Sequence, residues 1–294
     1  MKGSLADVRF RYIDTNGIRL HVAEAGPEDG PLVILLHGFP EFWYGWREQI
    51  PALADAGYRV LIPDQRGYNL SDKPLGIEAY RTEELAADVV GLIDACGRER
   101  AAAVIGHDWG GLVAWPLALE YPERFERLGI LNAPHPIVAD RSLRSPVQLA
   151  KSSYVFFFQL PRISELLLSA GDWLGLQQLL VRSSRSGTFP EEDLVCYRQA
   201  WEQSRAIEAM VNWCRAALRH RPRRVADQEV QVPAEIIWGA EDQVLGPEMA
   251  RQSLRFCGNG GLTLLPATHW VQHEEPEKVN ERLLSLLETD PQQG

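Results

Sequence analysis

The sequence AAVIGHDWGG at residues 102–111 decides the fold, because it joins a buried strand to a helix through a sharp turn. Its first four residues are apolar and predict a strand, and a helical pattern follows over 112–119. Gly106 and Gly110 flank Asp108, and in such a strand-turn-helix elbow the glycines remove side chains that would clash while the central residue is held in a strained backbone. Asp108 is therefore the side chain that the turn presents above the edge of the sheet.

Short apolar runs recur on both sides of this turn and alternate with helical patterns. Strands that alternate with helices form parallel sheets, so we predict an α/β protein with a mostly parallel, twisted sheet flanked by helices. Two further runs joined by a Thr-Asn-Gly turn predict an antiparallel hairpin at the sheet edge. The strands are predicted at 32–36, 59–62, 102–105, 128–131, 235–238 and 262–265, the helices at 46–56, 82–96 and 112–119, and the hairpin at 8–14 and 18–25.

The strand-helix alternation stops after Leu131 and resumes near 230–233. Residues 134–227 carry helical periodicity and many aromatic side chains, with no convincing strand. We therefore predict a helical cap at 134–227, inserted into a core formed by residues 1–133 and 228–294.

Composition limits the partners that this chain is expected to have. The 294 residues carry a formal charge of -10, and phosphate binding requires a basic face, so nucleic acid is not an expected partner. The N-terminal residues have no apolar core of a secretory signal, and the apolar stretches are too short to cross a bilayer, so we expect a cytoplasmic protein with no membrane span. The four cysteines form no CxxC pair and are expected to be reduced thiols. Nothing in the sequence indicates an oligomeric state.

An aspartate at the elbow points to a specific chemistry. A carboxylate with a reference pKa of about 3.9 is ionised at neutral pH and attacks without a base. It suits displacement at an alkyl carbon, which leaves an alkyl ester on the protein. Water must then cleave that ester, and this step requires a general base and stabilisation of an oxyanion. The alternative is that Asp108 merely caps the following helix, since Asp is a favoured N-cap residue.

Two later residues are candidates for the general base and its partner. His269 lies just beyond the last predicted strand, where a loop histidine can reach the elbow, and Asp242 follows the preceding strand. The order Asp108, Asp242, His269 matches the arrangement of nucleophile, acid and histidine in proteins with this elbow. A lone histidine is more often structural, and Glu241 competes with Asp242 for the role of partner.

An oxyanion hole is predicted from the segment His37-Gly38-Phe39-Pro40, which follows the strand at 32–36. A loop at this place can bring the backbone N–H of Phe39 beside that of Trp109. The HG dipeptide alone is weak evidence for an oxyanion hole. Here it follows a predicted strand, which is where the fold requires this loop.

Six segments, taken together, resemble the epoxide hydrolases of the α/β-hydrolase fold, the branch with an aspartate nucleophile that is related to haloalkane dehalogenases. The resemblance implies an α/β-hydrolase fold in which Asp108 opens the oxirane, Asp242 and His269 activate water, and cap tyrosines bind the leaving oxygen. It implies a small neutral epoxide or alkyl substrate, with water, and no metal or organic cofactor. The segments are HGFPEFWYGW (37–46), DQRGYNLSDKP (64–74), GHDWGG (106–111), YVFFFQLP (154–161), WGAEDQVL (238–245) and THW (268–270).

The cap departs from this family at one position. Tyr154 stands where the resemblance places the first cap tyrosine, although it has the alternative role of packing in an aromatic helix. The second tyrosine of the family stands in an N-W-Y-R-like motif, whereas this chain has Cys214 there. Cysteine is a weak donor, so one hydrogen bond to the oxygen is lost unless Tyr197, Trp213 or water replaces it. The candidates for the substrate pocket are His37, Pro40, Trp213, Cys214 and Trp270.

Three alternatives remain open at this point. A haloalkane dehalogenase needs N–H donors for halide, and the Trp109 indole can supply one, but Phe39 stands where many of those enzymes use Asn. A fluoroacetate dehalogenase carries Arg beside the nucleophile, where this chain has Trp109, which disfavours an acidic substrate. A non-catalytic binding protein that kept the fold would tolerate the loss of a cap tyrosine. Release of diol or of halide, or of neither, would separate these classes.

Overall fold

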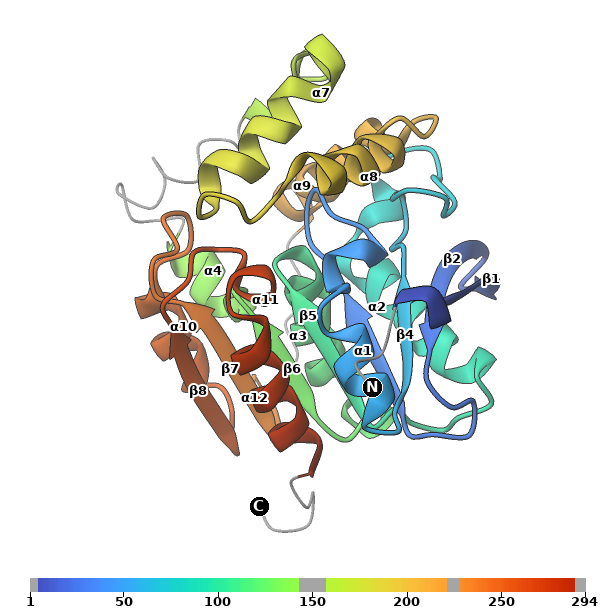
Figure 1. Ribbon diagram of the computed structural model, residues 1–294, viewed down its shortest axis with the longest axis vertical. Helices are drawn as coiled ribbons and strands as arrows, with labels where there is room; N and C mark the ends of the chain where they lie inside the picture. Colours follow the sequence, from blue (N-terminus) through green and yellow to red (C-terminus); the bar gives the residue numbers. More distant parts are fainter. Residues whose placement is uncertain (1–4, 143–156, 221–227, 289–294) are drawn as a thin grey trace.

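The computed structural model describes residues 5–142, 157–220 and 228–288. An eight-stranded sheet crosses the molecule in the order β1-β2-β4-β3-β5-β6-β7-β8 (Figure 1). Each predicted strand is present, and its ends differ from the prediction by no more than two residues. The strands are β1 (Arg9–Thr15), β2 (Ile18–Ala25), β3 (Leu32–Leu36), β4 (Arg59–Pro63), β5 (Ala103–His107), β6 (Leu128–Leu131), β7 (Ala234–Gly239) and β8 (Gly260–Leu265).

The sheet is antiparallel only at one edge. β1 pairs with β2 through a turn in which Asn16 and Gly17 both have positive φ, as a two-residue hairpin turn requires. β2 is also antiparallel to β4, and β4, β3, β5, β6, β7 and β8 then pair in parallel. The predicted edge hairpin and the predicted α/β fold are confirmed.

Helices cover both faces of the sheet because β3 and its neighbours are apolar on both sides. Leu32, Ile34 and Leu36 belong to the core that contains α2 and α3, whereas Val33 and Leu35 belong to the core under α1 and α12. The helices of the core are α1 (Ile50–Asp55), α2 (Thr82–Ala95), α3 (Trp109–Glu120), α10 (Pro247–Leu254), α11 (Val271–Glu274) and α12 (Pro276–Glu288), with short 3₁₀ turns at Leu5–Asp7, Trp43–Trp46, Glu78–Tyr80 and Pro122–Arg124.

One predicted helix is shorter than the sequence suggested. The helix expected at 46–56 is a 3₁₀ turn at Trp43–Trp46 followed by α1, which begins at Ile50. Pro51 stands in the first turn of α1, where its missing N–H leaves no bond unmade, so the proline favours a new helix start rather than a continuous helix.

The elbow is tighter than predicted. β5 ends at His107 and α3 begins at Trp109, so Asp108 alone makes the turn, with φ 51° and ψ -118°. This is a strained conformation for a residue with a side chain. A Cβ on Gly110 would lie 2.1 Å from the Leu36 carbonyl oxygen, so the helix can approach β3 this closely only with glycine there.

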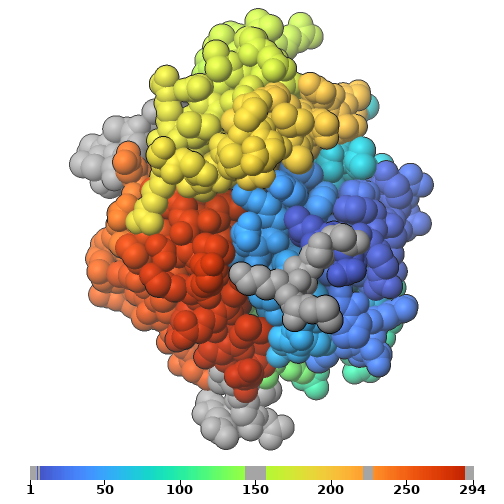
Figure 2. Space-filling model, in the orientation of Figure 1, coloured from blue at the N-terminus to red at the C-terminus, as the bar shows by residue number. Residues whose placement is uncertain are grey.

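The described residues between β6 and β7 form helices, which lie over one end of the sheet (Figure 1). In Figure 2 the yellow and gold residues of this layer pack directly against the core. Trp201 donates its indole N–H to the Pro40 carbonyl at 2.6 Å, so the layer covers the loop that follows the carboxyl end of β3. The division at residues 134 and 227 stays a prediction. The helices are α4 (Pro136–Ser142), α7 (Ile163–Ser183), α8 (Glu191–Trp201) and α9 (Ala206–Arg219).

Across residues 5–142, 157–220 and 228–288, we find no helix that combines the length and the apolar character needed to span a bilayer.

We predict that Gly110→Ala lowers the free energy of unfolding by at least about 2 kcal/mol, because a backbone carbonyl rather than a flexible side chain must move. Gly246→Ala is the matched control: it has negative φ and nothing within 4 Å of an added Cβ, so it should cost less than about 1 kcal/mol. Urea unfolding of both variants measures the difference, and equal costs would contradict this account of the elbow.

Candidate active site

Three side chains from three separate loops meet at the carboxyl ends of the parallel strands. Asp108 follows β5, Asp242 follows β7 and His269 follows β8. His269 Nδ1 lies 2.8 Å from Asp242 Oδ2, and its Nε2 lies 3.4 Å from Asp108 Oδ2. The structure therefore places one imidazole between two carboxylates.

Asp108 does not act as a helix cap, although it stands at the N-cap position of α3. Its side chain makes no capping hydrogen bond. Oδ1 instead accepts a hydrogen bond from the Phe39 backbone N–H at 2.9 Å, and Oδ2 faces His269. A Cβ on Gly38 would lie 2.5 Å from Oδ1, so glycine at 38 allows the loop to lie against the carboxylate.

The sequence predicts an oxyanion hole from the N–H groups of Phe39 and Trp109, and the structure places the Phe39 N–H on this carboxylate. Phe39 supplies one of them directly. Trp109 is the first residue of α3, so its backbone N–H has no acceptor within the helix and lies at the positive end of the helix dipole. Both features favour negative charge on Asp108 Oδ1.

Asp242 is held by several donors and is the partner of His269, not Glu241. Oδ1 accepts the backbone N–H groups of Val244 and Leu245, both at 2.8 Å. Burial alone would raise the pKa of Asp242, but the charge and hydrogen bond of His269 and the hydrogen bonds from the Leu245 N–H and the Asn132 amide lower it. Glu241 is exposed and pairs with Arg185 at 3.1 Å.

Asn132 is a site residue that the sequence prediction missed. It directly follows β6, and its amide donates to Asp242 Oδ2 at 2.7 Å while its Oδ1 accepts the Gly239 N–H at 3.0 Å. The signal was present, because Asn132 is a polar residue that directly follows a buried strand, as Asp108 directly follows the neighbouring strand β5.

The charges around His269 control its protonation. Burial alone would lower the pKa of His269, but the charge of Asp242 and the hydrogen bonds that the ring donates to Asp108 and Asp242 raise it to about 10. At neutral pH the imidazole is therefore protonated.

A buried carboxylate, Glu41, lies behind this arrangement and was also missed. Glu41 Oε1 accepts the Tyr197 hydroxyl of α8 at 2.7 Å and lies 2.7 Å from His273 Nε2, and Oε2 lies 3.3 Å from His107 Nδ1. His107 Nε2 donates to the His269 carbonyl oxygen at 2.9 Å. Glu41 thus connects the helices over the sheet with the loop that carries His269.

Comparisons with known proteins identify the family of this chain. Residues 31–276 match the family model described as the alpha/beta hydrolase fold. The chain is 49% identical to the AB hydrolase superfamily protein YfhM of Bacillus subtilis, over 95% of this chain and 98% of that protein. It is 39% identical to Epoxide hydrolase 1 of Caenorhabditis elegans, over 94% of this chain and 70% of that protein.

A solved structure has a fold similar to that of this chain. The crystal structure of Bacillus megaterium epoxide hydrolase in complex with an inhibitor superposes with a TM-score of 0.87 at 30% identity, covering 95% of this chain and 100% of that one. This chain belongs to the α/β-hydrolase-fold epoxide hydrolase family. The family resemblance seen in the sequence motifs is confirmed.

The side chains predicted to line the substrate pocket are mostly buried, and hydrogen bonds hold two of them, His37 and Trp270, in place. The ring nitrogens of His37 bond to backbone groups, with Nε2 accepting the Gln65 N–H at 3.0 Å and Nδ1 lying 3.1 Å from the Gly38 carbonyl. Trp270 donates its indole N–H to Ser183 at 2.8 Å and packs edge-on against His269. Both residues therefore have hydrogen-bonding roles within the protein.

Of the two positions where the family resemblance places cap tyrosines, the structure describes only Cys214. Cys214 is buried on α9, and burial raises the pKa of its thiol, which keeps it protonated. Trp213 packs edge-on against Trp109, with ring centroids 6.1 Å apart, and Phe39 lies 5.4 Å from Phe158. Aromatic rings thus gather around the elbow. Tyr154 lies outside the described residues.

We predict that Glu41→Gln lowers the free energy of unfolding at pH 7 by about 2 kcal/mol, because it weakens hydrogen bonds to a charged, buried group. Burial opposes ionisation, but the charge of His273 and the hydrogen bonds from His107 and His273 hold the pKa of Glu41 well below its usual value. A lowered folded-state pKa gives stability above the unfolded value that is lost as pH falls, so the cost should shrink below about pH 4.5.

Urea unfolding at pH 7 and at pH 4 tests this dependence. Glu48→Gln is the control, because the Glu48 side chain is half exposed and its ion pair with Arg47 is 3.8 Å long. A Glu41 variant as stable as the parent at pH 7 would show that the buried carboxylate stabilises nothing.

Proposed function

We propose that this protein hydrolyses small neutral epoxides to vicinal diols in two steps, through a covalent ester on Asp108. The observation that carries the proposal is the position of Asp108 at the elbow, with one oxygen on the Phe39 N–H and the other beside His269. Relatives named epoxide hydrolases, 39% identical in one case, support the substrate class.

In the first step the free carboxylate oxygen attacks. Oδ2 is the oxygen that lies away from the Phe39 N–H, and it displaces the ring oxygen from one epoxide carbon. A new C–O ester bond forms, and the electron pair of the broken ring bond stays on the leaving oxygen. The ionised carboxylate needs no base for this step. Tyr154 is proposed to donate a hydrogen bond to the leaving oxygen, as the family resemblance implies.

In the second step water attacks the ester carbonyl. Alkylation turns Asp108 into a neutral ester, which removes one of the two anions that raise the pKa of His269. The imidazole then gives up its proton more easily and acts as the general base for water, oriented by Asp242. Oδ1 becomes the oxyanion, stabilised by the Phe39 N–H and, in this proposal, by the Trp109 N–H. When the intermediate collapses, the bond from the carbonyl carbon to the alkyl oxygen breaks, the diol leaves with a proton from His269, and the Asp108 carboxylate is restored. The proposed steps use side chains, backbone N–H groups and water, without a metal or organic cofactor.

The surroundings of Asp108 favour a neutral substrate. Phe39, Phe158, Trp109 and Trp213 contribute aromatic rings near the elbow. Trp109 stands directly after Asp108, where a substrate carboxylate would require a cationic side chain. An aromatic site of this kind binds aryl or alkyl epoxides better than acids.

A substrate screen tests the activity. We expect purified protein to convert styrene oxide or an aliphatic epoxide to the diol, without halide release from chloroalkanes of similar size. Asp108→Ala serves as the control that removes the nucleophile. Halide release without diol formation would replace this proposal with a dehalogenase, and turnover of neither class by the folded protein would contradict an enzymatic role.

We predict that His269→Gln still forms the ester but does not hydrolyse it, since only the second step needs a base. Intact-mass spectrometry after mixing with an epoxide should show the variant enriched in a species heavier by one substrate. With a substrate that the parent turns over, absence of this adduct would contradict the proposed division of labour.

We predict that ester hydrolysis becomes faster as pH rises, because the general base must be neutral. His269 titrates near 10 in the free protein, and the loss of the Asp108 charge places the inflection of the hydrolysis rate at lower pH. Single-turnover decay of the preformed ester between pH 5 and 10 gives this inflection, and nitrogen NMR of His269 gives the free-protein value. An inflection at or above the free-protein pKa would contradict the charge argument.

A further inference from the structure

Because Cys214 stands in place of a tyrosine, the proposed epoxide site has one hydrogen-bond donor fewer. The two side chains that could replace it, Tyr197 and Trp213, already donate to other groups. The Tyr197 hydroxyl donates to Glu41 Oε1 at 2.7 Å. The Trp213 indole N–H donates to the Arg66 carbonyl at 2.9 Å. Each would have to break an existing buried hydrogen bond before it reached a substrate, so neither is a suitable donor.

Tyr68 is a buried donor with a free hydroxyl. Its side chain is 1% exposed, and among the described residues its hydroxyl has no hydrogen-bond partner. Buried hydroxyls are bonded in the large majority of cases, and one that is left unbonded costs stability. This cost is explained if the hydroxyl is kept for a group that enters with the substrate.

Tyr68 belongs to the surroundings of Asp108. Its ring lies edge-on to His37, with centroids 4.6 Å apart, and His37 is two residues from the Phe39 N–H that holds Asp108. On the other side its ring lies 5.4 Å from Trp213, the neighbour of Cys214. Burial, followed by the charge of Asp108, raises the pKa of Tyr68 well above its usual value, so the phenol keeps its proton.

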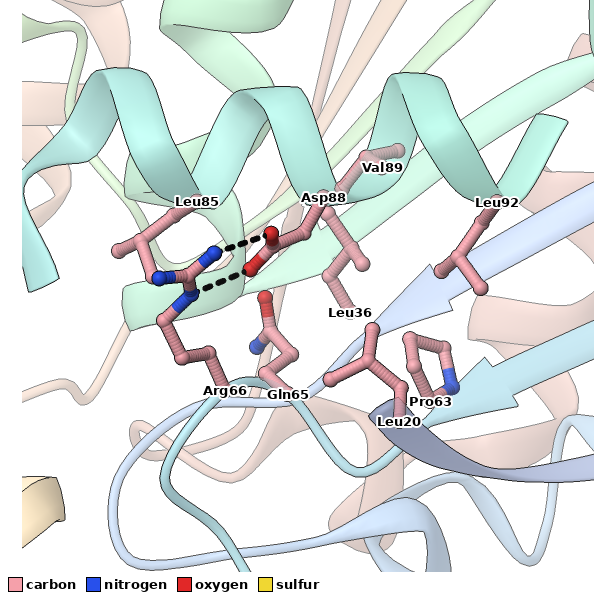
Figure 3. A pocket seen from close by; sticks show the side chains of 9 residues that line it. All are labelled: Leu20, Leu36, Pro63, Gln65, Arg66, Leu85, Asp88, Val89 and Leu92. Carbon is pink, nitrogen blue, oxygen red and sulfur yellow. Dashed lines mark hydrogen bonds and ion pairs between the residues drawn. The ribbon is translucent and has the colours of Figure 1, made fainter. Parts of the chain in front are cut away.

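The loop that carries Tyr68 is rigidly held. Figure 3 shows Arg66 paired through two nitrogens with Asp88 of α2, beside a small cavity lined mainly by apolar side chains. The distances are 2.8 and 2.6 Å, and the Arg66 carbonyl accepts the Trp213 indole. Backbone bonds from Tyr68 to Gln65 and from Ser71 to Tyr68 close two turns around the tyrosine. A donor fixed in this way needs little reorganisation.

We propose that the Tyr68 hydroxyl donates a hydrogen bond to the epoxide oxygen and takes the place of the second cap tyrosine, which is Cys214 in this chain. The inference rests on the proposed function. As Asp108 forms the ester bond, the ring C–O bond breaks and its electron pair stays on the oxygen that Tyr68 stabilises. The proton that this oxygen finally gains equals the one that water releases in ester hydrolysis, so the two steps balance.

The Tyr68→Phe variant distinguishes a catalytic role of the Tyr68 hydroxyl from a structural one. We expect the single-turnover rate of Asp108 alkylation to fall about 10- to 100-fold, somewhat less than the roughly 10²–10³ for a fully preorganised oxyanion donor. The rate of ester hydrolysis should not change. Thermal stability should be equal or higher, because the variant removes an unbonded buried hydroxyl.

Tyr80→Phe is the matched control. Tyr80 is equally buried, but its hydroxyl donates to the Pro74 carbonyl at 2.8 Å. Its removal should lower the melting temperature and leave the alkylation rate unchanged. The two tyrosines thus predict opposite patterns of stability and rate.

Cys214→Tyr completes the test by restoring the donor that the family carries. It should accelerate alkylation in the parent, and in its presence Tyr68→Phe should have a clearly smaller effect, because two donors to one atom are coupled. Equal effects of Tyr68→Phe in both backgrounds, or parental alkylation by Tyr68→Phe alone, would overturn the role of Tyr68 while leaving epoxide hydrolysis intact. Failure of the parent to form any Asp108 ester would overturn the proposed function itself.

Discussion

One buried imidazole between two carboxylates is the interaction on which the rest of the site depends. His269 Nδ1 lies 2.8 Å from Asp242 and Nε2 lies 3.4 Å from Asp108. The two charges outweigh the desolvation that would otherwise keep the ring neutral. The proposed alkylation of Asp108 removes one of them, so that the covalent step itself prepares the base for the next step. In this proposal His269 becomes the general base without a conformational change.

The fold supplies this arrangement through the edge of a parallel sheet. Asp108, Asp242 and Asn132 all follow strands whose carboxyl ends meet there. Asp242 is oriented by Asn132 and by two backbone N–H groups, and the His269 carbonyl is held by His107. Glu41 joins this layer to the helices above through Tyr197. These hydrogen bonds hold the charged side chains in place and so maintain the distances between them.

Local patterns predicted most of the fold because strands buried on both faces give unbroken apolar runs, such as the one that forms β3. Asp108, Asp242 and His269 were predictable since each follows such a run. Glu41 and His273 were not, because their meeting depends on how a loop and a short helix pack, which no spacing encodes. Tyr68 lies in the segment at 64–74 that resembles the epoxide hydrolases, but only the packed structure reveals that its hydroxyl is unbonded. The limits of a helix also depend on single residues, as Pro51 shows in α1.

The central claim is that an ester forms on Asp108 and that water cleaves it at the carbonyl carbon. A single turnover with an epoxide in oxygen-18 water, with excess protein, tests this most directly. The account predicts that mass spectrometry finds the label in the peptide that contains Asp108, while the first diol released carries none. Label in the first diol, with an unlabelled Asp108 peptide, would mean that water attacks the epoxide directly and would contradict the account.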